Sequence, residues 1–161
     1  MFTGIVEETG FIKSFDGHKL IIECSKVLEN TQIGDSIAID GCCQTVVSMS
    51  TNSFSADVSA ETLKITKGFK TGECVNLERA LLPQGLIENA SATGKEGYLR
   101  STRQTRMGGH IVQGHIDGTG KYLGNMTFEV PKELDKYIVY KGSIAINGVS
   151  LTVSKNKNNT S

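Results

Sequence analysis

The sequence predicts an all-β fold in which one small unit occurs twice. The chain of 161 residues has 18 glycines, only 2 prolines and no tryptophan, which indicates many tight turns between short strands. Residues 36–47, SIAIDGCCQTVV, recur as residues 143–154, SIAINGVSLTVS, with seven of twelve positions identical at an offset of 107. Residues 3–10 and 113–120 also match, at an offset of 110. Because order and spacing are both kept, we interpret the repeat as a duplicated domain; the alternative is a chance likeness between two strand–turn–strand segments.

The first copy contains six short segments, rich in Ile, Val, Thr and Phe, that we expect to be β-strands. They span residues 2–12, 19–24, 36–39, 42–48, 53–58 and 73–78. Closing such a sheet on itself removes its exposed edges, so the predicted architecture is a small six-stranded barrel.

Turns and short helices complete the local predictions. The pairs Asp40-Gly41 and Asn147-Gly148 predict type I′ hairpin turns, in which both central residues have positive φ. Brief helices are predicted at residues 59–63 and 131–139. Ser59 is the expected cap of the first, and Pro131 is the expected first helical position of the second.

The repeat divides the chain into three parts. Residues 1–81 form the first barrel, residues 82–107 a linker, and residues 108–161 the second barrel. An offset of 107 places Ser161 opposite Phe54, so the second copy has no counterpart of about residues 55–81 and we expect it to be a partial barrel. Three arginines in the linker, Arg100, Arg103 and Arg106, would contact a phosphate or a partner, or would form an ordinary solvated charge cluster.

Charge and composition exclude several functions. The 17 Lys and Arg balance the 17 Asp and Glu, so no diffuse attraction to nucleic acid or to an anionic membrane surface is expected. Glu7 and Glu8 interrupt the start before an apolar run can form, which argues against a secretory signal, and no stretch approaches a membrane span. We therefore expect a cytoplasmic protein whose four cysteines, at positions 24, 42, 43 and 74, are thiols and hold no metal.

Two histidines of the second copy invite a chemical interpretation. His110 and His115 are five residues apart, which places them on opposite faces of a strand and argues against a shared metal. His115 occupies the position that Ile5 holds in the first copy. Replacing an apolar residue by a titratable one suggests a functional role, and a hydrogen-bonded structural histidine is the alternative.

A small polar cluster recurs at the same point of both copies. Alternation on a strand places Cys43 and Thr45 on one face, and Ser150 and Thr152 on the equivalent face of the second copy. Such residues also serve as small core fillers. Their repetition in register favours hydrogen bonds to two similar ligands, one in each copy.

Several motifs spread over nearly the whole chain resemble riboflavin synthase of the alpha-chain type. They are MFTGIV at 1–6, DGCCQTV at 40–46, ETL at 61–63, VNLERA at 75–80, GGHIVQGH at 108–115, YKG at 140–142 and GVSLTV at 148–153. The resemblance implies two six-stranded Greek-key barrels in a homotrimer. It also implies a cofactor-free transferase, which converts two molecules of 6,7-dimethyl-8-ribityllumazine to riboflavin and 5-amino-6-(D-ribitylamino)uracil, and an association with lumazine synthase.

The same resemblance implies which residues meet the substrates. One lumazine would contact Gly4, Ile5, Val6, Cys43, Gln44, Thr45, Asp57, Val58, Ser59, Ala60, Glu61 and Thr62, largely through backbone groups. The other would contact Gly114, His115, Ile116, Lys141, Ser150, Leu151 and Thr152. The reaction needs a proton removed from a 7-methyl group and a nucleophile or water added to the partner ring, with the anion delocalised into the heterocycle. The expected catalytic residues are Cys43 and His115, which would assist these steps, and Ser150 and Thr152, which would orient substrate.

Two departures from the family pattern shape the expected activity. The segment at 82–107 is longer than the family's usual connection, and the last strands of the second barrel and the trimer helix have no counterpart in this sequence. We therefore expect the chain to bind ligand through its first barrel and to turn over weakly or not at all. The rival hypothesis is a non-catalytic lumazine- or flavin-binding protein of the same fold, against which the retained Cys43, His115, Lys141, Ser150 and Thr152 argue.

Overall fold

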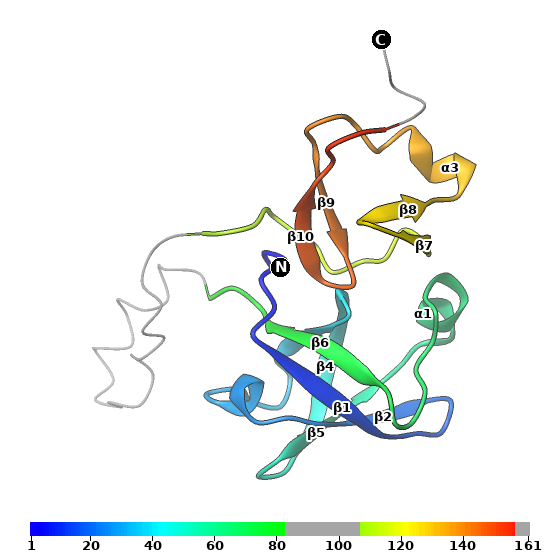
Figure 1. Cartoon of the computed structure of the whole chain (residues 1–161). Helices are drawn as coiled ribbons and strands as arrows, with labels where there is room; N and C mark the ends of the chain where they lie inside the picture. The colour runs from blue at the N-terminus through cyan, green and yellow to red at the C-terminus, as the bar shows by residue number, and fades with distance from the viewer. Residues whose placement is uncertain (83–106, 157–161) are drawn as a thin grey trace.

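The computed structural model describes residues 1–82 and 107–156, and the fold is mostly β as predicted (Figure 1). Six strands close into an antiparallel barrel in the order β1-β2-β5-β4-β3-β6. Their bounds are β1 Glu8–Phe15, β2 Lys19–Glu23, β3 Ser36–Ile39, β4 Cys42–Met49, β5 Ser53–Asp57 and β6 Cys74–Arg79. Strands β3, β4 and β5 follow one another as hairpins, and a longer connection from β2 to β3 leaves β5 beside β2, which is a Greek key.

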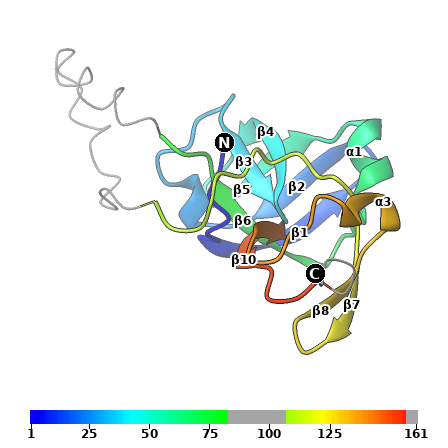
Figure 2. The same ribbon diagram turned by 90° about the horizontal axis from the view of Figure 1, so that it is seen from above.

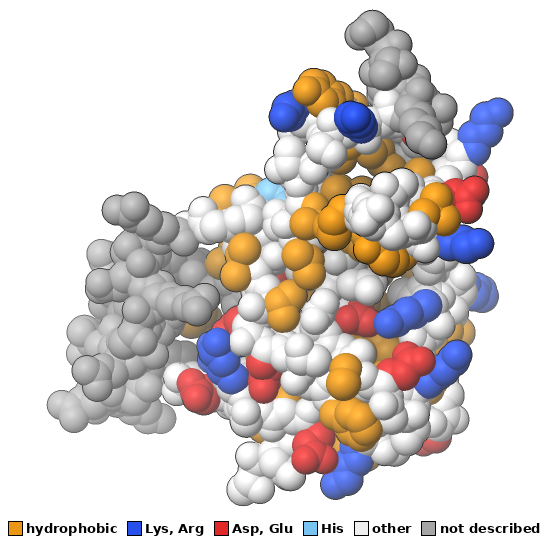
Figure 3. Space-filling view, viewed as in Figure 1, with side chains coloured by type: hydrophobic (Ala, Val, Ile, Leu, Met, Phe, Trp, Pro, Cys, Tyr) orange, Lys and Arg blue, Asp and Glu red, His pale blue; other side chains and the backbone are white. Residues whose placement is uncertain are grey.

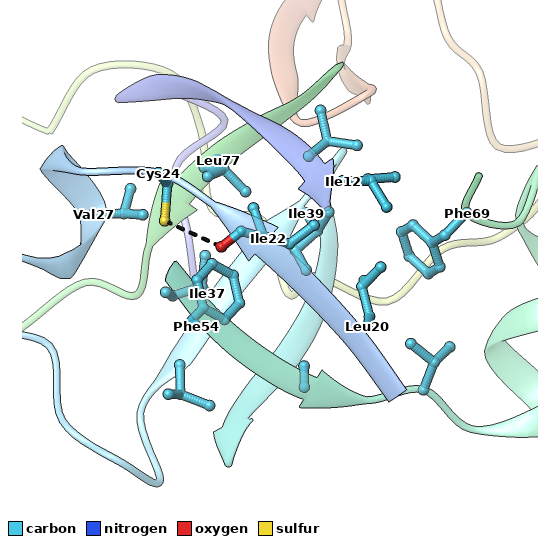
Figure 4. Close-up of a cluster of buried hydrophobic side chains, with 14 residues drawn as sticks. Ile12, Leu20, Ile22, Cys24, Val27, Ile37, Ile39, Phe54, Phe69 and Leu77 are labelled. Atoms are coloured by element: carbon cyan, nitrogen blue, oxygen red, sulfur yellow. Dashed lines mark hydrogen bonds between the residues drawn. The ribbon is translucent and has the colours of Figure 1, made fainter. Parts of the chain in front are cut away.

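The barrel forms because its strands alternate between inward apolar and outward polar side chains. On β2, Leu20 and Ile22 are fully buried while Lys19 and Glu23 are exposed. Figure 4 shows the inward side chains meeting inside the barrel. Each large apolar side chain contributes about 1.5–3 kcal/mol by leaving water, so this shared core fixes the register of every strand.

The two predicted hairpin turns are confirmed. Asp40 and Gly41 have φ of 48° and 85°, and Asn147 and Gly148 have φ of 49° and 76°. The first turn joins β3 to β4, and the second joins β9 (Ser143–Ile146) to β10 (Val149–Thr152). Both copies of the repeat therefore build the same hairpin.

Two local predictions need correction. The first strand begins at Glu8 and not at residue 2, because the buried Glu78 carboxylate draws Thr3 and Gly4 to the end of β6. Helix α1 (Ala60–Ile65) is capped by Ser59 as predicted, since its hydroxyl accepts the Thr62 N–H. Pro131 lies before helix α3 (Lys132–Asp135) with an extended ψ of 138°, so its prediction as the first helical residue is wrong, and the helix is shorter than predicted. A short 3₁₀ turn, Lys26–Leu28, precedes β3.

The second unit, residues 107–156, does not close into a barrel in the described part of the chain. It contains the β9–β10 hairpin, a second hairpin of β7 (Lys121–Gly124) and β8 (Thr127–Glu129), and α3. Figures 1 and 2 show it against one end of the barrel. Most of the predicted linker and its three arginines lie outside the described residues. Within those residues, no helix is long and apolar enough to cross a membrane.

The contacts between the barrel and the second unit, here called the junction, come in symmetric pairs. Phe2 and Val112, related by the offset of 110, exchange two backbone hydrogen bonds of 2.7 and 3.0 Å. The Ser150 N–H donates to the Gly4 carbonyl at 2.7 Å, and its counterpart is the Cys43 N–H, which donates to the Gly114 carbonyl at 2.8 Å. The barrel and the second unit contribute equivalent residues to the junction, as the two subunits do in a two-fold symmetric dimer. The duplication therefore produced an internal pseudo-dimer.

An ion pair on the barrel surface ties β6 to the segment before β1. The Arg79 guanidinium donates to both Glu7 carboxylate oxygens, with Nε at 3.1 Å from each, and the Arg79 backbone N–H donates to Oε1 at 2.9 Å. Burial alone would raise the pKa of Glu7, but the hydrogen bonds from Arg79 and the charges of Arg79 and Lys26 outweigh it and lower the pKa below its usual 4.5.

The depressed pKa makes a prediction about acid stability. Folded Glu7 keeps its charge at pH values where the unfolded chain is protonated, so its stabilising contribution is present above about pH 4.5 and is lost as pH falls through the folded pKa. We expect Glu7→Gln to lower the free energy of unfolding by about 1–3 kcal/mol near neutral pH and by less in acid. Urea denaturation between about pH 7 and pH 3 measures this. Glu23→Gln, at an exposed position on β2, is the control; equal pH slopes for both variants would contradict the assignment.

The turn glycines at the junction support a second prediction. A Cβ at Gly41 would lie 2.8 Å from the Gly148 nitrogen, whereas a Cβ at Gly17, whose φ of 98° is also left-handed, would meet nothing within 4 Å. We expect Gly17→Ala to cost only the left-handed backbone penalty of about 1–2 kcal/mol. Gly41→Ala should cost more and should also displace the β9–β10 hairpin, which speeds hydrogen exchange of the Ser150 amide. Equal losses of stability with unchanged Ser150 protection would argue against close contact at this point.

Candidate functional site

A hollow on the outer wall of the barrel brings together six of the predicted site residues. The hollow, here called the β4 pocket, has a volume of about 290 Å³. It is lined by Cys43, Gln44, Thr45, Val47, Asp57, Ser59 and Thr62. Only Val47 among these residues was not predicted. The volume is near the lower end of the range for ligand sites and suits one flat heterocycle.

Strand alternation explains how β4 forms one wall of the pocket. Cys42, Gln44 and Val46 are buried in the barrel, while Cys43 is half-buried and Thr45 is exposed on the outer face. The Gln44 side chain is only 5% exposed, and its Nε2 donates to the Cys42 sulfur at 3.2 Å. Gln44 therefore meets the pocket through its backbone, in line with the backbone contacts that the resemblance implies.

The opposite wall is the end of β5 and the start of α1. The Ser59 hydroxyl accepts the Thr62 N–H at 3.1 Å and lies 3.0 Å from the Thr62 hydroxyl. The Asp57 carboxylate lies 3.8 Å from Nε2 of the exposed His18. The pocket thus offers hydroxyls, a thiol, one carboxylate and backbone groups, a set that can hydrogen-bond the polar edge of a heterocycle.

Of the four cysteines, Cys43 alone lines the β4 pocket. Burial raises the pKa of Cys42, and burial together with the charges of Glu8 and Glu23 raises the pKa of Cys24 to about 12. Neither thiol ionises readily near neutral pH. Cys74 is exposed at the start of β6 and does not line the pocket.

Several other predicted contacts of the first ligand lie away from the pocket lining. Val58 is 2% exposed and belongs to the barrel core. Ala60 and Glu61 are exposed on α1, where Glu61 pairs with Lys64 at 3.4 Å. Gly4 lies at the junction, where a Cβ would be 2.7 Å from the Ser150 Cβ, and Ile5 and Val6 continue this segment.

The residues predicted for the second ligand extend from the junction into the second unit. Gly114 accepts a hydrogen bond from Cys43, so His115, the next residue along the chain and exposed, is close to the β4 pocket. Ser150 and Leu151 are half-buried on β10, and Thr152 is exposed. Ile116 is half-buried, and Lys141 is exposed with its ammonium 5.3 Å from the Tyr140 ring centre. A further hollow of about 450 Å³, beside β7 and β8, is lined by none of the predicted residues.

Sequence reasoning missed three residues that organise the junction. Phe2 is fully buried, and a Cβ at Gly114 would lie 2.7 Å from its ring. Glu78 is 5% exposed and accepts three hydrogen bonds from Thr3 and Gly4. His110 contacts the Ser150 hydroxyl at 2.7 Å. The sequence of β6, CVNLER, contains no signal for Glu78, which falls on the polar side of the alternation beside Arg79. From the sequence, His110 was considered only as a metal ligand.

Comparisons with known proteins agree with this geometry. The family model described as the lumazine binding domain matches residues 3–80 and again residues 113–161. Riboflavin synthase of Bacillus subtilis is 41% identical over 167 residues, and that of Actinobacillus pleuropneumoniae is 42% identical over 169 residues. Both matches cover 95% of this chain and 68% of the relative.

Solved structures of LumP share the fold. LumP complexed with riboflavin superimposes with a TM-score of 0.72 at 25% identity, covering 98% of this chain and 83% of LumP. LumP complexed with 6,7-dimethyl-8-(1'-D-ribityl) lumazine gives a TM-score of 0.67 over 94% of this chain and 78% of LumP. With two matches to one domain model and about 40% identity over most of its length, this chain belongs to the riboflavin synthase family.

Proposed function

We propose that the β4 pocket binds one 6,7-dimethyl-8-ribityllumazine and that the chain uses it to form riboflavin. The observation that supports this most directly is the gathering of Cys43, Thr45, Asp57, Ser59 and Thr62 around one hollow. Their hydroxyls and the β4 backbone can pair with the pyrimidinedione edge, which has both donors and acceptors.

The second lumazine, in this proposal, is held by Ser150, Leu151 and Thr152 on β10 together with His115. Support comes from the pseudo-symmetric junction, which gives Ser150 and Cys43 equivalent backbone hydrogen bonds. Two copies of one site suit a reaction between two copies of one molecule. Holding both substrates in a fixed relation converts a bimolecular step into an effectively unimolecular one.

The proposed chemistry transfers a four-carbon unit between the two lumazines. A base removes a proton from the 7-methyl group of one ring, and the electron pair delocalises into that heterocycle. The partner ring accepts a nucleophile or water, and the carbanion then forms a carbon–carbon bond to it. As the carbon–nitrogen bonds of the partner ring break, its four carbons stay on the first molecule, which becomes riboflavin. The added nucleophile or water is released, and the rest of the partner leaves as 5-amino-6-(D-ribitylamino)uracil.

Cys43 and His115 are the proposed assisting groups. Cys43 is the half-buried thiol that lines the pocket. His115 directly follows Gly114, whose carbonyl accepts the Cys43 backbone N–H.

Incubation of the chain with the lumazine tests this function directly. Riboflavin formation, followed by its absorbance, supports the enzyme, and slower formation in Cys43→Ser and His115→Gln supports the two assignments. Tight lumazine binding without riboflavin would favour a non-catalytic binding protein, the second candidate, which the likeness to LumP complexed with the lumazine favours.

The domain limits, assembly and location belong to the same proposal. We propose lumazine-binding domains at residues 1–81 and 108–161, joined by residues 82–107. Homotrimer formation is supported by the apolar side chains that gather over the second unit in Figure 3. The exposed apolar residues of that unit include Tyr122, Leu123, Met126, Tyr137 and Tyr140. A cytoplasmic location and an association with lumazine synthase stay predictions.

One substitution isolates the polar contacts of the β4 pocket. Thr45→Val keeps the shape and the strand preference of the side chain but removes a hydroxyl, so we expect lumazine affinity to fall about tenfold with little change in stability. Fluorescence titration of the lumazine measures it. Thr127→Val, on β8 and away from the pocket, is the matched control. An unchanged affinity in Thr45→Val would remove that hydroxyl from the site.

A further inference from the structure

His110 makes a side-chain contact across the second unit that the proposed chemistry does not use. Its Nδ1 lies 2.7 Å from the Ser150 hydroxyl, a hydrogen-bond distance, in a partly buried setting. The two residues are 40 positions apart in sequence, so only the folded second unit brings them together.

Both residues of this pair are fixed through their backbones to the same short segment. The His110 N–H donates to the Thr3 carbonyl at 3.0 Å, and the Ser150 N–H donates to the Gly4 carbonyl at 2.7 Å. Thr3 and Gly4 are held in turn by the buried Glu78 carboxylate. A chain of hydrogen bonds therefore runs from the barrel core to the Ser150 side chain.

We propose that His110 is a positioning residue that orients the Ser150 hydroxyl toward substrate. A serine hydroxyl has one proton and two acceptor lone pairs and rotates freely unless a partner fixes it. The Nδ1 contact fixes that rotation, so the remaining hydrogen-bonding capacity of Ser150 points in one direction. This inference rests on the proposed function, in which Ser150 contacts the second lumazine.

The pseudo-symmetry of the junction allows the His110–Ser150 contact to be compared with the equivalent place in the first copy. Ser150 occupies the position of Cys43, and both backbone N–H groups make equivalent bonds. Within residues 1–82 and 107–156, the Ser150 hydroxyl has this histidine contact, whereas the equivalent Cys43 side chain makes no side-chain hydrogen bond. The two sites thus present their small polar side chains differently, which suits two lumazines that play different parts in one reaction.

A double-mutant cycle tests the positioning role. We expect His110→Ala to lower kcat for riboflavin formation about tenfold, the size of one lost hydrogen bond, while KM changes less than threefold. His110→Asn, whose amide reaches about the place of Nδ1, should recover most of the rate. In a Ser150→Ala background, His110→Ala should have no further effect, because the group on which it acts is gone.

The outcomes separate this inference from the proposed function. A wild-type rate in His110→Ala, or a full additional loss in the Ser150→Ala background, would overturn the positioning role while leaving the function intact. A wild-type chain that forms no riboflavin contradicts the catalytic function instead. In that case lumazine affinity replaces kcat as the quantity measured in the double-mutant cycle. The positioning role then requires that His110→Ala weakens binding, that His110→Asn recovers it, and that His110→Ala has no further effect in the Ser150→Ala background. Thermal unfolding of each variant identifies a loss of fold, and a His110→Asn variant that folds normally but is as slow as His110→Ala also contradicts the proposal.

Discussion

A single buried carboxylate fixes the segment of the barrel that makes most of the backbone hydrogen bonds to the second unit. Glu78, near the end of β6, accepts the Thr3 N–H and hydroxyl at 2.7 Å each and the Gly4 N–H at 3.0 Å. Burying a charge is costly unless it is fully hydrogen-bonded, and three donors meet that condition. The segment fixed in this way presents the carbonyls of Phe2, Thr3 and Gly4 to the second unit, which accept three of its backbone N–H groups.

Duplication explains why the site has its form. The same hairpin, with the same left-handed turn, occurs in both units, and the two turns meet where Gly41 and Gly148 leave no room for a side chain. The equivalent residues Cys43 and Ser150 then lie at equivalent places on either side of the junction. In the proposed function such a pair of sites would hold the two identical substrates, and the His110 contact is one difference between the two places.

Local patterns in the sequence predicted much of the fold because they act over a few residues. The strand segments, the two type I′ turns and the Ser59 cap follow from alternation, turn chemistry and capping. The start of β1 did not, because Thr3 and Gly4 are placed by Glu78, which is 74 to 75 positions away along the chain. The resemblance to the family named six of the seven residues that line the β4 pocket. It did not indicate that Gln44 points inward or that His110 reaches Ser150, because both depend on packing.

Hydrogen exchange of individual amides in a Glu78→Gln variant tests the role of this carboxylate most directly. The variant keeps the size of the side chain but replaces one acceptor oxygen by an amide that cannot accept the Gly4 N–H. The account predicts that the Ser150 and Val112 amides, which donate to Gly4 and Phe2, exchange at least about tenfold faster, while the β2 amides of Leu20 and Ile22 keep their protection. Unchanged protection at Ser150 and Val112 would contradict it.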